Sequence, residues 1–192
     1  MAGETVRSEA VCLAIHPWSR TSHVVAWLTP SGRVTTLVKG AVRPKSFFLG
    51  QYDLNYTCDI VYYEHARGEV HALKECAVVK RRDALRETYR ALVLAEYFRK
   101  VVFELAPFGP DAADWFKLIC FSLDRLARGV EKPVLIEEMN RFDLSVLDLA
   151  GVLGNENFSE KPMDKARVIS VYYANALDYA PDLRRQVLTM IC

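Results

Sequence analysis

The stretch HVVAWLTPSGRVTTLVKG, residues 23–40, decides the fold. Two runs rich in Val and Thr flank the short sequence PSG, and β-branched residues on either side of a tight turn are typical of a β-hairpin. A comparable apolar run, EAVCLAI, occupies residues 9–15. Two more runs, residues 54–64 and 69–79, are separated by HARG, in which Gly68 can adopt a positive φ. The first 80 residues therefore predict five strands.

Beyond residue 80 the apolar residues recur with the period of a helix. Leu85, Tyr89 and Leu92 fall near one helical face. Gly129 and Gly151 suit the position that follows the end of a helix, where a positive φ is common. The expected helices cover residues 83–105, 112–129, 133–151, 164–177 and 182–191.

Strands followed by helices indicate an α+β protein with two segregated units, residues 1–80 and residues 81–192. Five strands in a short, basic unit fit the OB-fold, a five-stranded β-barrel whose surface binds oligonucleotides. The period of the strands does not distinguish this barrel from an SH3-like one. We therefore expect an N-terminal five-stranded OB-fold β-barrel followed by an all-α helical domain.

The overall composition is that of an ordinary soluble chain. With 192 residues, of which 51% are hydrophobic, the chain can bury one large core or two small ones. No run approaches the roughly 20 consecutive apolar residues that span a bilayer. Residues 1–11 hold two acidic residues and no apolar core, unlike a signal peptide, so we expect a cytoplasmic location and no membrane partner.

The five cysteines are scattered, without a CxxC pair or the spacing of a metal site. We expect reduced thiols and neither a metal nor another cofactor. Cys12, Cys58 and Cys120 stand in apolar stretches, where a small buried side chain is the simpler interpretation than a nucleophile.

Residues 10–52 contain no acidic residue, although 26% of the chain is charged and its net charge is only +1. A solvated loop is the simplest explanation of such a run. Cations without nearby acids can also neutralise DNA phosphates in a salt-dependent manner, without reading the sequence. We expect the five cations of this window to line one DNA-binding face, with Arg67 on the next hairpin as a weaker member: Arg20, Arg33, Lys39, Arg43 and Lys45.

Two details extend this hypothesis. Pro44 restricts its neighbours, so RPK at residues 43–45 is predicted to be extended. Arg82 and Arg86, continued by Arg90, follow a four-residue step that could prolong the phosphate track along a helix. Asp83 and Glu87 lie nearby and could pair with these arginines instead, and the sequence leaves that choice open.

The aromatic residues near the basic window have two interpretations. Trp18, in a turn between Pro17 and Ser19, is a possible base-stacking residue, because every base offers a flat π-face. Phe47 and Phe48 are predicted to plug one end of the barrel rather than to contact DNA.

Catalysis has little support in the sequence. The histidines all fall among the strands without a recurring carboxylate partner, and no GxSxG, HExxH or phosphate-binding glycine loop is present. We therefore expect a protein that is not an enzyme, with no catalytic residues. A hydrolase or transferase with an unrecognised site is the rival from another class.

Residues 9–46 resemble the start of the bacterial recombination mediator family RecO, through EAVCLAIHPWSRTSHVVAWLTPSGRVTTLVKGAVRPKS. The likeness continues through LDRLARG and FDLSVLDLAGVL, and it covers about 150 residues. The family's zinc-binding cysteines would follow, but this chain has NENFSEKPMDKARV there, without a cysteine pair.

The resemblance implies a DNA-binding protein of repair and recombination. Such a protein binds single- and double-stranded DNA, promotes strand annealing and helps load a recombinase, together with RecR. It also contacts the acidic C-terminal tail of the single-stranded DNA-binding protein, a role expected of the helical domain. A protein-interaction adaptor that kept the fold but lost DNA binding is the alternative.

Overall fold

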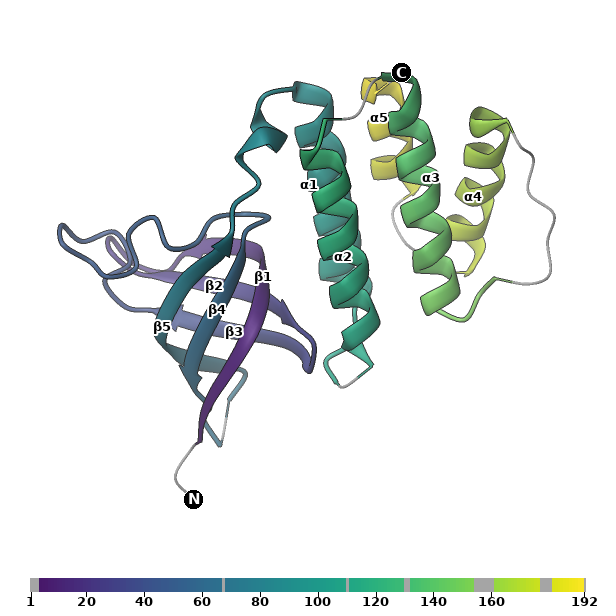
Figure 1. Ribbon diagram of the computed structural model, residues 1–192. Coiled ribbons are helices and arrows are strands. Elements are labelled where there is room, and N and C mark those ends of the chain that lie inside the picture. Colours follow the sequence, from purple (N-terminus) through teal and green to yellow (C-terminus); the bar gives the residue numbers. More distant parts are fainter. Residues whose placement is uncertain are drawn as a thin grey trace. The chain divides into compact units, whose positions relative to one another are not determined.

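The computed structural model describes residues 4–66, 68–109, 111–129, 132–153, 161–176 and 181–191, and it has an α+β architecture (Figure 1). Within these residues a five-stranded β-barrel precedes five α-helices, as expected. The strands are β1 (Thr5–Pro17), β2 (His23–Thr29), β3 (Gly32–Val38), β4 (Thr57–Tyr63) and β5 (Val70–Lys80). A short 3₁₀ helix η1 (Asp83–Arg86) leads to α1 (Tyr89–Leu105), α2 (Ala112–Ala127), α3 (Lys132–Leu149), α4 (Pro162–Ala176) and α5 (Pro181–Ile191).

The barrel is closed in the order β1-β2-β3-β5-β4. The β3–β5 pair is parallel and the other four pairs are antiparallel, which is the connectivity of an OB-fold. The first half of β1, up to Val11, pairs with β4, and its second half, from Val11, pairs with β2 with a register shift between Cys12 and Ala14. This irregularity lets one strand bend and serve two neighbours.

Alternating apolar residues of the strands fill the barrel. Trp27, the largest of them, is fully buried, and its Nε1–H donates to Thr36 Oγ1 at 2.8 Å. Cys12 and Cys58 are buried thiols in the same core, as predicted, and burial raises the pKa of Cys12. The basic segment after β3 contributes the buried Ala41 and the partly buried Phe48 to this core.

The chain forms two compact units, and their boundaries do not coincide with the change from strands to helices. Unit 1 contains Met1–Arg82 with Arg99–Cys120, and unit 2 contains Asp83–Phe98 with Phe121–Cys192. Strands do give way to helices at Lys80, near the expected boundary, but α1 and α2 each contribute residues to both units. In unit 1 the Arg99 guanidinium donates to the carbonyl of Leu13, which ties α1 to the barrel.

The turn between β2 and β3 depends on a glycine. Gly32 has a φ of +135°, and a Cβ added there would lie 2.7 Å from the carbonyl oxygen of Phe108. We expect Gly32→Ala to lower the free energy of unfolding by about 2–4 kcal/mol, because backbone strain and a clash with backbone act together.

The matched control is Gly68→Ala. Gly68 also has a positive φ, +113°, but nothing lies within 4 Å of an added Cβ. The Gly68→Ala substitution should lower the free energy of unfolding, measured by urea denaturation, by only about 1 kcal/mol. Equal losses for the two variants would show that the approach of Phe108 to the turn is unimportant.

Candidate nucleic-acid interface

Two loops at one end of the barrel are joined by hydrogen bonds. The first connects β1 to β2, and the second, residues 39–56, connects β3 to β4. The Gly40 N–H donates to Ser22 Oγ at 3.2 Å, and the Val42 N–H donates to the Thr21 carbonyl at 3.3 Å. These contacts bring cations from separate parts of the sequence onto adjoining loops: Arg20, Lys39, Arg43 and Lys45, which we call the cationic loop surface.

The second loop is a series of tight turns, so the prediction that residues 43–45 are extended is wrong. The N–H of Arg43 donates to Gly40, and the N–H of Ser46 donates to Arg43, at 3.1 and 3.0 Å. Lys45 has a φ of +66°. Pro44 and Lys45 thus occupy the central positions of a turn with the signature of type II, in which the second central residue needs a positive φ.

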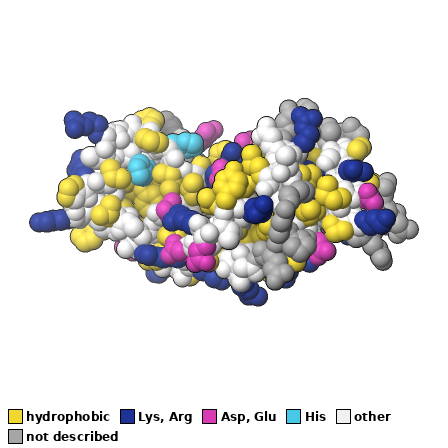
Figure 2. All heavy atoms as spheres, turned by 90° about the horizontal axis from the view of Figure 1, so that it is seen from above, with side chains coloured by type: hydrophobic (Ala, Val, Ile, Leu, Met, Phe, Trp, Pro, Cys, Tyr) yellow, Lys and Arg dark blue, Asp and Glu magenta, His cyan; other side chains and the backbone are white. Residues whose placement is uncertain are grey.

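The four cations of the cationic loop surface are exposed. Among the described residues none of them forms an ion pair with an acidic side chain. The next acid along the chain, Asp53, accepts a hydrogen bond from the Leu54 N–H at 2.7 Å. Figure 2 shows Lys and Arg side chains standing out from the left-hand edge of the barrel. The surface can therefore attract a polyanion without an internal counter-charge.

Arg33 does not join this surface, contrary to the expectation of one face. It lies at the start of β3, whereas Lys39 follows its end, about 20 Å away along a seven-residue strand. Its guanidinium donates to the Phe103 carbonyl and stands 3.7 Å from the centroid of the Phe108 ring. Burial lowers the pKa of Arg33, and Glu104 opposes that effect. Arg33 packs α1 and the following loop against the barrel within unit 1.

The predicted arginine track is also broken up. Arg82 is buried, and its guanidinium donates to the Asn55 carbonyl at 2.6 Å and to Thr57 Oγ1 at 3.0 Å. Arg86 ends η1, at 3.9 Å from Asp83, and α1 begins only at Tyr89, so the three arginines do not share one helical face. Arg67 lies outside the described residues.

Arg81 is a cation that the sequence reasoning missed. It is exposed and its Nη2 lies 3.5 Å from the carbonyl oxygen of Gly50, in the same loop as Lys39 and Arg43. Its guanidinium stands 5.9 Å from the Tyr56 ring centroid. The sequence KRR, residues 80–82, indicates such a cation. Neighbouring residues at the end of a strand point to opposite faces, so Arg81 is exposed where Arg82 is buried.

Substitutions of Arg81 and Arg82 should have different effects, one on DNA binding and the other on stability. Arg82→Ala should lower the free energy of unfolding by about 2–3 kcal/mol, because two buried acceptors lose a charged donor, while the folded fraction keeps its affinity for DNA. Arg81→Ala should leave stability within about 0.5 kcal/mol and weaken DNA binding several-fold. Urea denaturation and a fluorescence titration measure the two effects. Weaker DNA binding by Arg82→Ala, with unchanged binding by Arg81→Ala, would place Arg82 in the interface.

The aromatic residues divide in an unexpected way. Phe48 is half-buried and packs on the barrel core, as predicted, but Phe47 is 94% exposed, so the prediction that it plugs the barrel is wrong. Trp18 is 70% exposed and is not a core residue. Trp18 and Phe47 belong to the two loops that carry the cationic loop surface.

His23, next to the first of these loops, has an identified hydrogen-bond partner. His23 Nδ1 hydrogen-bonds the Tyr52 hydroxyl at 2.8 Å, as a satisfied strand histidine would, and burial raises the pKa of Tyr52. In the described ranges no three His, Cys, Asp or Glu side chains come together as a metal site. No helix in those ranges is long and apolar enough to cross a membrane.

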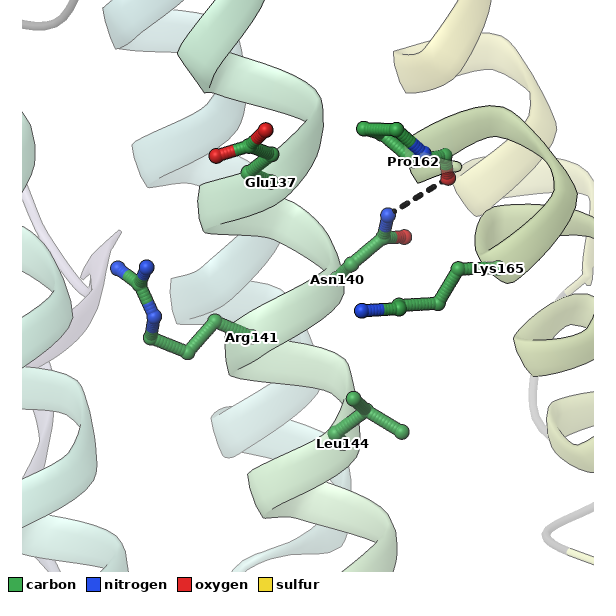
Figure 3. Close-up of a pocket in the computed structure, with 6 residues that line it drawn as sticks. All are labelled: Glu137, Asn140, Arg141, Leu144, Pro162 and Lys165. Carbon is green, nitrogen blue, oxygen red and sulfur yellow. Dashed lines mark hydrogen bonds between the residues drawn. The ribbon is translucent and has the colours of Figure 1, made fainter. Parts of the chain in front are cut away.

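A second candidate lies in unit 2, where a pocket of about 300 Å³ opens between α3 and α4 (Figure 3). Two of the side chains that line it form hydrogen bonds. Asn140 Nδ2 donates to the Pro162 carbonyl at 2.8 Å, and Arg141 donates to the buried Glu138 at 2.6 Å. Burial alone would raise the pKa of Glu138, but hydrogen bonds from Arg125 and Arg141 outweigh it, and the pKa is lowered. The pocket is lined by Glu137, Asn140, Arg141, Leu144, Pro162 and Lys165.

No protein-family model matches the chain, and no curated protein matches it either. A functional assignment therefore depends on the fold and on the chemistry of the cationic loop surface.

Proposed function

We propose that this protein binds DNA through the cationic loop surface of its OB-fold barrel and is not an enzyme. One observation carries the proposal: four exposed cations without acidic partners converge on two hydrogen-bonded loops of this barrel. OB-folds bind nucleic acids with their loops and adjoining strands, so the cations occur on a suitable part of the fold.

The binding would be directed at phosphates. Lys and Arg side chains on loops neutralise the backbone and release counterions, which gives affinity without sequence preference. Trp18 adds a flat apolar side chain beside the cations and is proposed to contact a base.

A wider role follows from the resemblance to RecO proteins. We propose that the protein acts as a mediator of recombination and repair, which anneals strands and helps load a recombinase with RecR. The acidic tail of the single-stranded DNA-binding protein has a candidate receptor in the pocket of unit 2. Arg141 and Lys165 line this pocket and could attract carboxylates, while Glu137 opposes them.

The direct test is a titration of labelled single-stranded and duplex DNA at low salt, followed by an annealing assay with the single-stranded DNA-binding protein present. The proposal predicts binding of both forms and faster annealing of coated strands. Absent DNA binding with retained binding of RecR would favour the adaptor alternative. Turnover of a substrate without DNA binding would favour an enzyme.

A further inference from the structure

The loops of the cationic loop surface also expose large apolar side chains. Phe47 is 94% exposed, Trp18 70%, Leu49 59% and Val42 47%. Single exposed apolar residues are common on protein surfaces. Here all four belong to the two joined loops that carry Arg20, Lys39, Arg43 and Lys45, so charge and apolar surface occur together.

The backbone holds Phe47 in its outward position. The Phe48 N–H donates to Ser46 Oγ at 3.3 Å, and the Leu49 N–H donates to the Ser46 carbonyl at 3.2 Å. Phe48 is anchored on the barrel core. Since Phe48 and the turn fix the chain beside it, Phe47 is presented to solvent without the entropy cost of ordering a mobile loop on binding.

The combination of groups narrows the choice of ligand. Four cations without acids complement a polyanion, and exposed aromatic rings complement flat apolar faces. A single strand of nucleic acid offers both, because its bases are accessible. In a duplex the base faces are stacked on each other, and a side chain reaches them only by unstacking the helix, at a cost of a few kcal/mol.

We propose that Phe47, together with Trp18, stacks on unpaired bases and makes the cationic loop surface select single-stranded over double-stranded nucleic acid. This inference rests on the proposed DNA binding and adds its strand selectivity. The cations supply affinity for both forms, whereas the two aromatic rings contribute only when bases are unpaired.

The first experiment compares Phe47→Ala, Phe47→Leu and the control Leu49→Ala in titrations with an oligothymidylate and with a duplex of equal length. Leu keeps apolar bulk but removes the flat ring. Both Phe47 variants should bind the single strand about 10-fold more weakly and the duplex within about twofold of the unaltered protein. Leu49→Ala should change neither affinity. An equal loss on both ligands, or rescue by Leu, would overturn stacking.

A second ligand separates this inference from the proposed function. An oligomer of abasic deoxyribose phosphates keeps the charges but offers no bases. The unaltered protein should bind it more weakly than oligothymidylate, and Phe47→Ala should cause no further loss. If the protein binds the abasic oligomer and the base-containing strand equally, stacking fails while phosphate binding stands. If it binds neither, the proposed function fails as well.

Tryptophan fluorescence reports on the second ring. Trp27 and Trp115 are buried, so Trp18 is the exposed indole among the described residues. Oligothymidylate should quench its emission, and the abasic oligomer should not. Vesicles containing an anionic phospholipid serve as the competing ligand: tight vesicle binding that Phe47→Ala abolishes, with single-strand affinity unchanged, would assign the surface to membranes and overturn the proposal.

Discussion

Replacing Arg184 by Met is expected to lower the free energy of unfolding of unit 2 by about 3–5 kcal/mol, the largest effect of any single substitution considered. Arg184 is fully buried in α5, and its Nε donates to Asp143 Oδ2 in α3 at 2.7 Å. Its Nη1 donates to the Ala166 carbonyl in α4 at 2.7 Å. One side chain thereby links three helices.

The expected loss of unfolding free energy is large because Asp143 would remain buried without its positively charged partner. Its other oxygen accepts hydrogen bonds from the Tyr97 and Tyr173 hydroxyls at 2.8 and 3.1 Å. Burial raises the pKa of Asp143, and Arg184 is the main group that opposes this effect. Without the guanidinium, a buried carboxylate must remain charged without a counter-ion or take up a proton, and either costs free energy.

Urea denaturation followed by circular dichroism measures the effect, with Arg185→Met as the control on the exposed side of α5. The control should change stability by less than about 0.5 kcal/mol. The double variant Arg184→Met with Asp143→Leu should recover part of the loss, since no charge is then left buried. A loss below about 1 kcal/mol for Arg184→Met would show that the ion pair does not hold α5 in place.

Replacing Lys39, Arg43 and Lys45 together by Ala is expected to weaken single-strand binding about 100-fold at 0.1 M salt. Each cation that contacts a phosphate releases counterions, so three lost contacts reduce both affinity and its dependence on salt. The slope of log affinity against log salt should flatten by about two units, because each phosphate contact with a single strand contributes about 0.7 to it. All three side chains are exposed, and the fold should be unchanged.

The matched control removes three other exposed arginines, Arg90, Arg128 and Arg167, all of them in unit 2. Net charge changes equally in the two triple variants. The control should keep its salt slope and lose only the small part of its affinity that comes from the general field of the protein. Equal weakening in both variants would mean that net charge, and not the cationic loop surface, determines binding.

The strands and helices were largely predictable because local chemistry specifies them. PSG at the turn between β2 and β3, and Gly68 in the next hairpin, mark turns that need positive φ, and both glycines have it. Gly129 and Gly151 follow α2 and α3 for the same reason. The closure of the barrel through the parallel β3–β5 pair joins distant residues, which local periodicity does not report.

The candidate site was predictable only in part. An acid-free window located the cations, but not their directions: Arg33 lies at the far end of β3, and Arg82 points inward beneath Arg81. The turn at Pro44 depends on hydrogen bonds between successive turns of the loop, and Phe47 differs from its neighbour Phe48 only in the face it occupies. These properties depend on tertiary contacts that composition and spacing do not contain.

The most direct test of the central claim is the affinity of the unaltered protein for a labelled single-stranded oligonucleotide at several salt concentrations between about 50 and 300 mM. Phosphate contact by the four cations of the cationic loop surface predicts a straight line of log affinity against log salt with a slope of about −3. Absent binding, or an affinity that does not change with salt, would contradict the account.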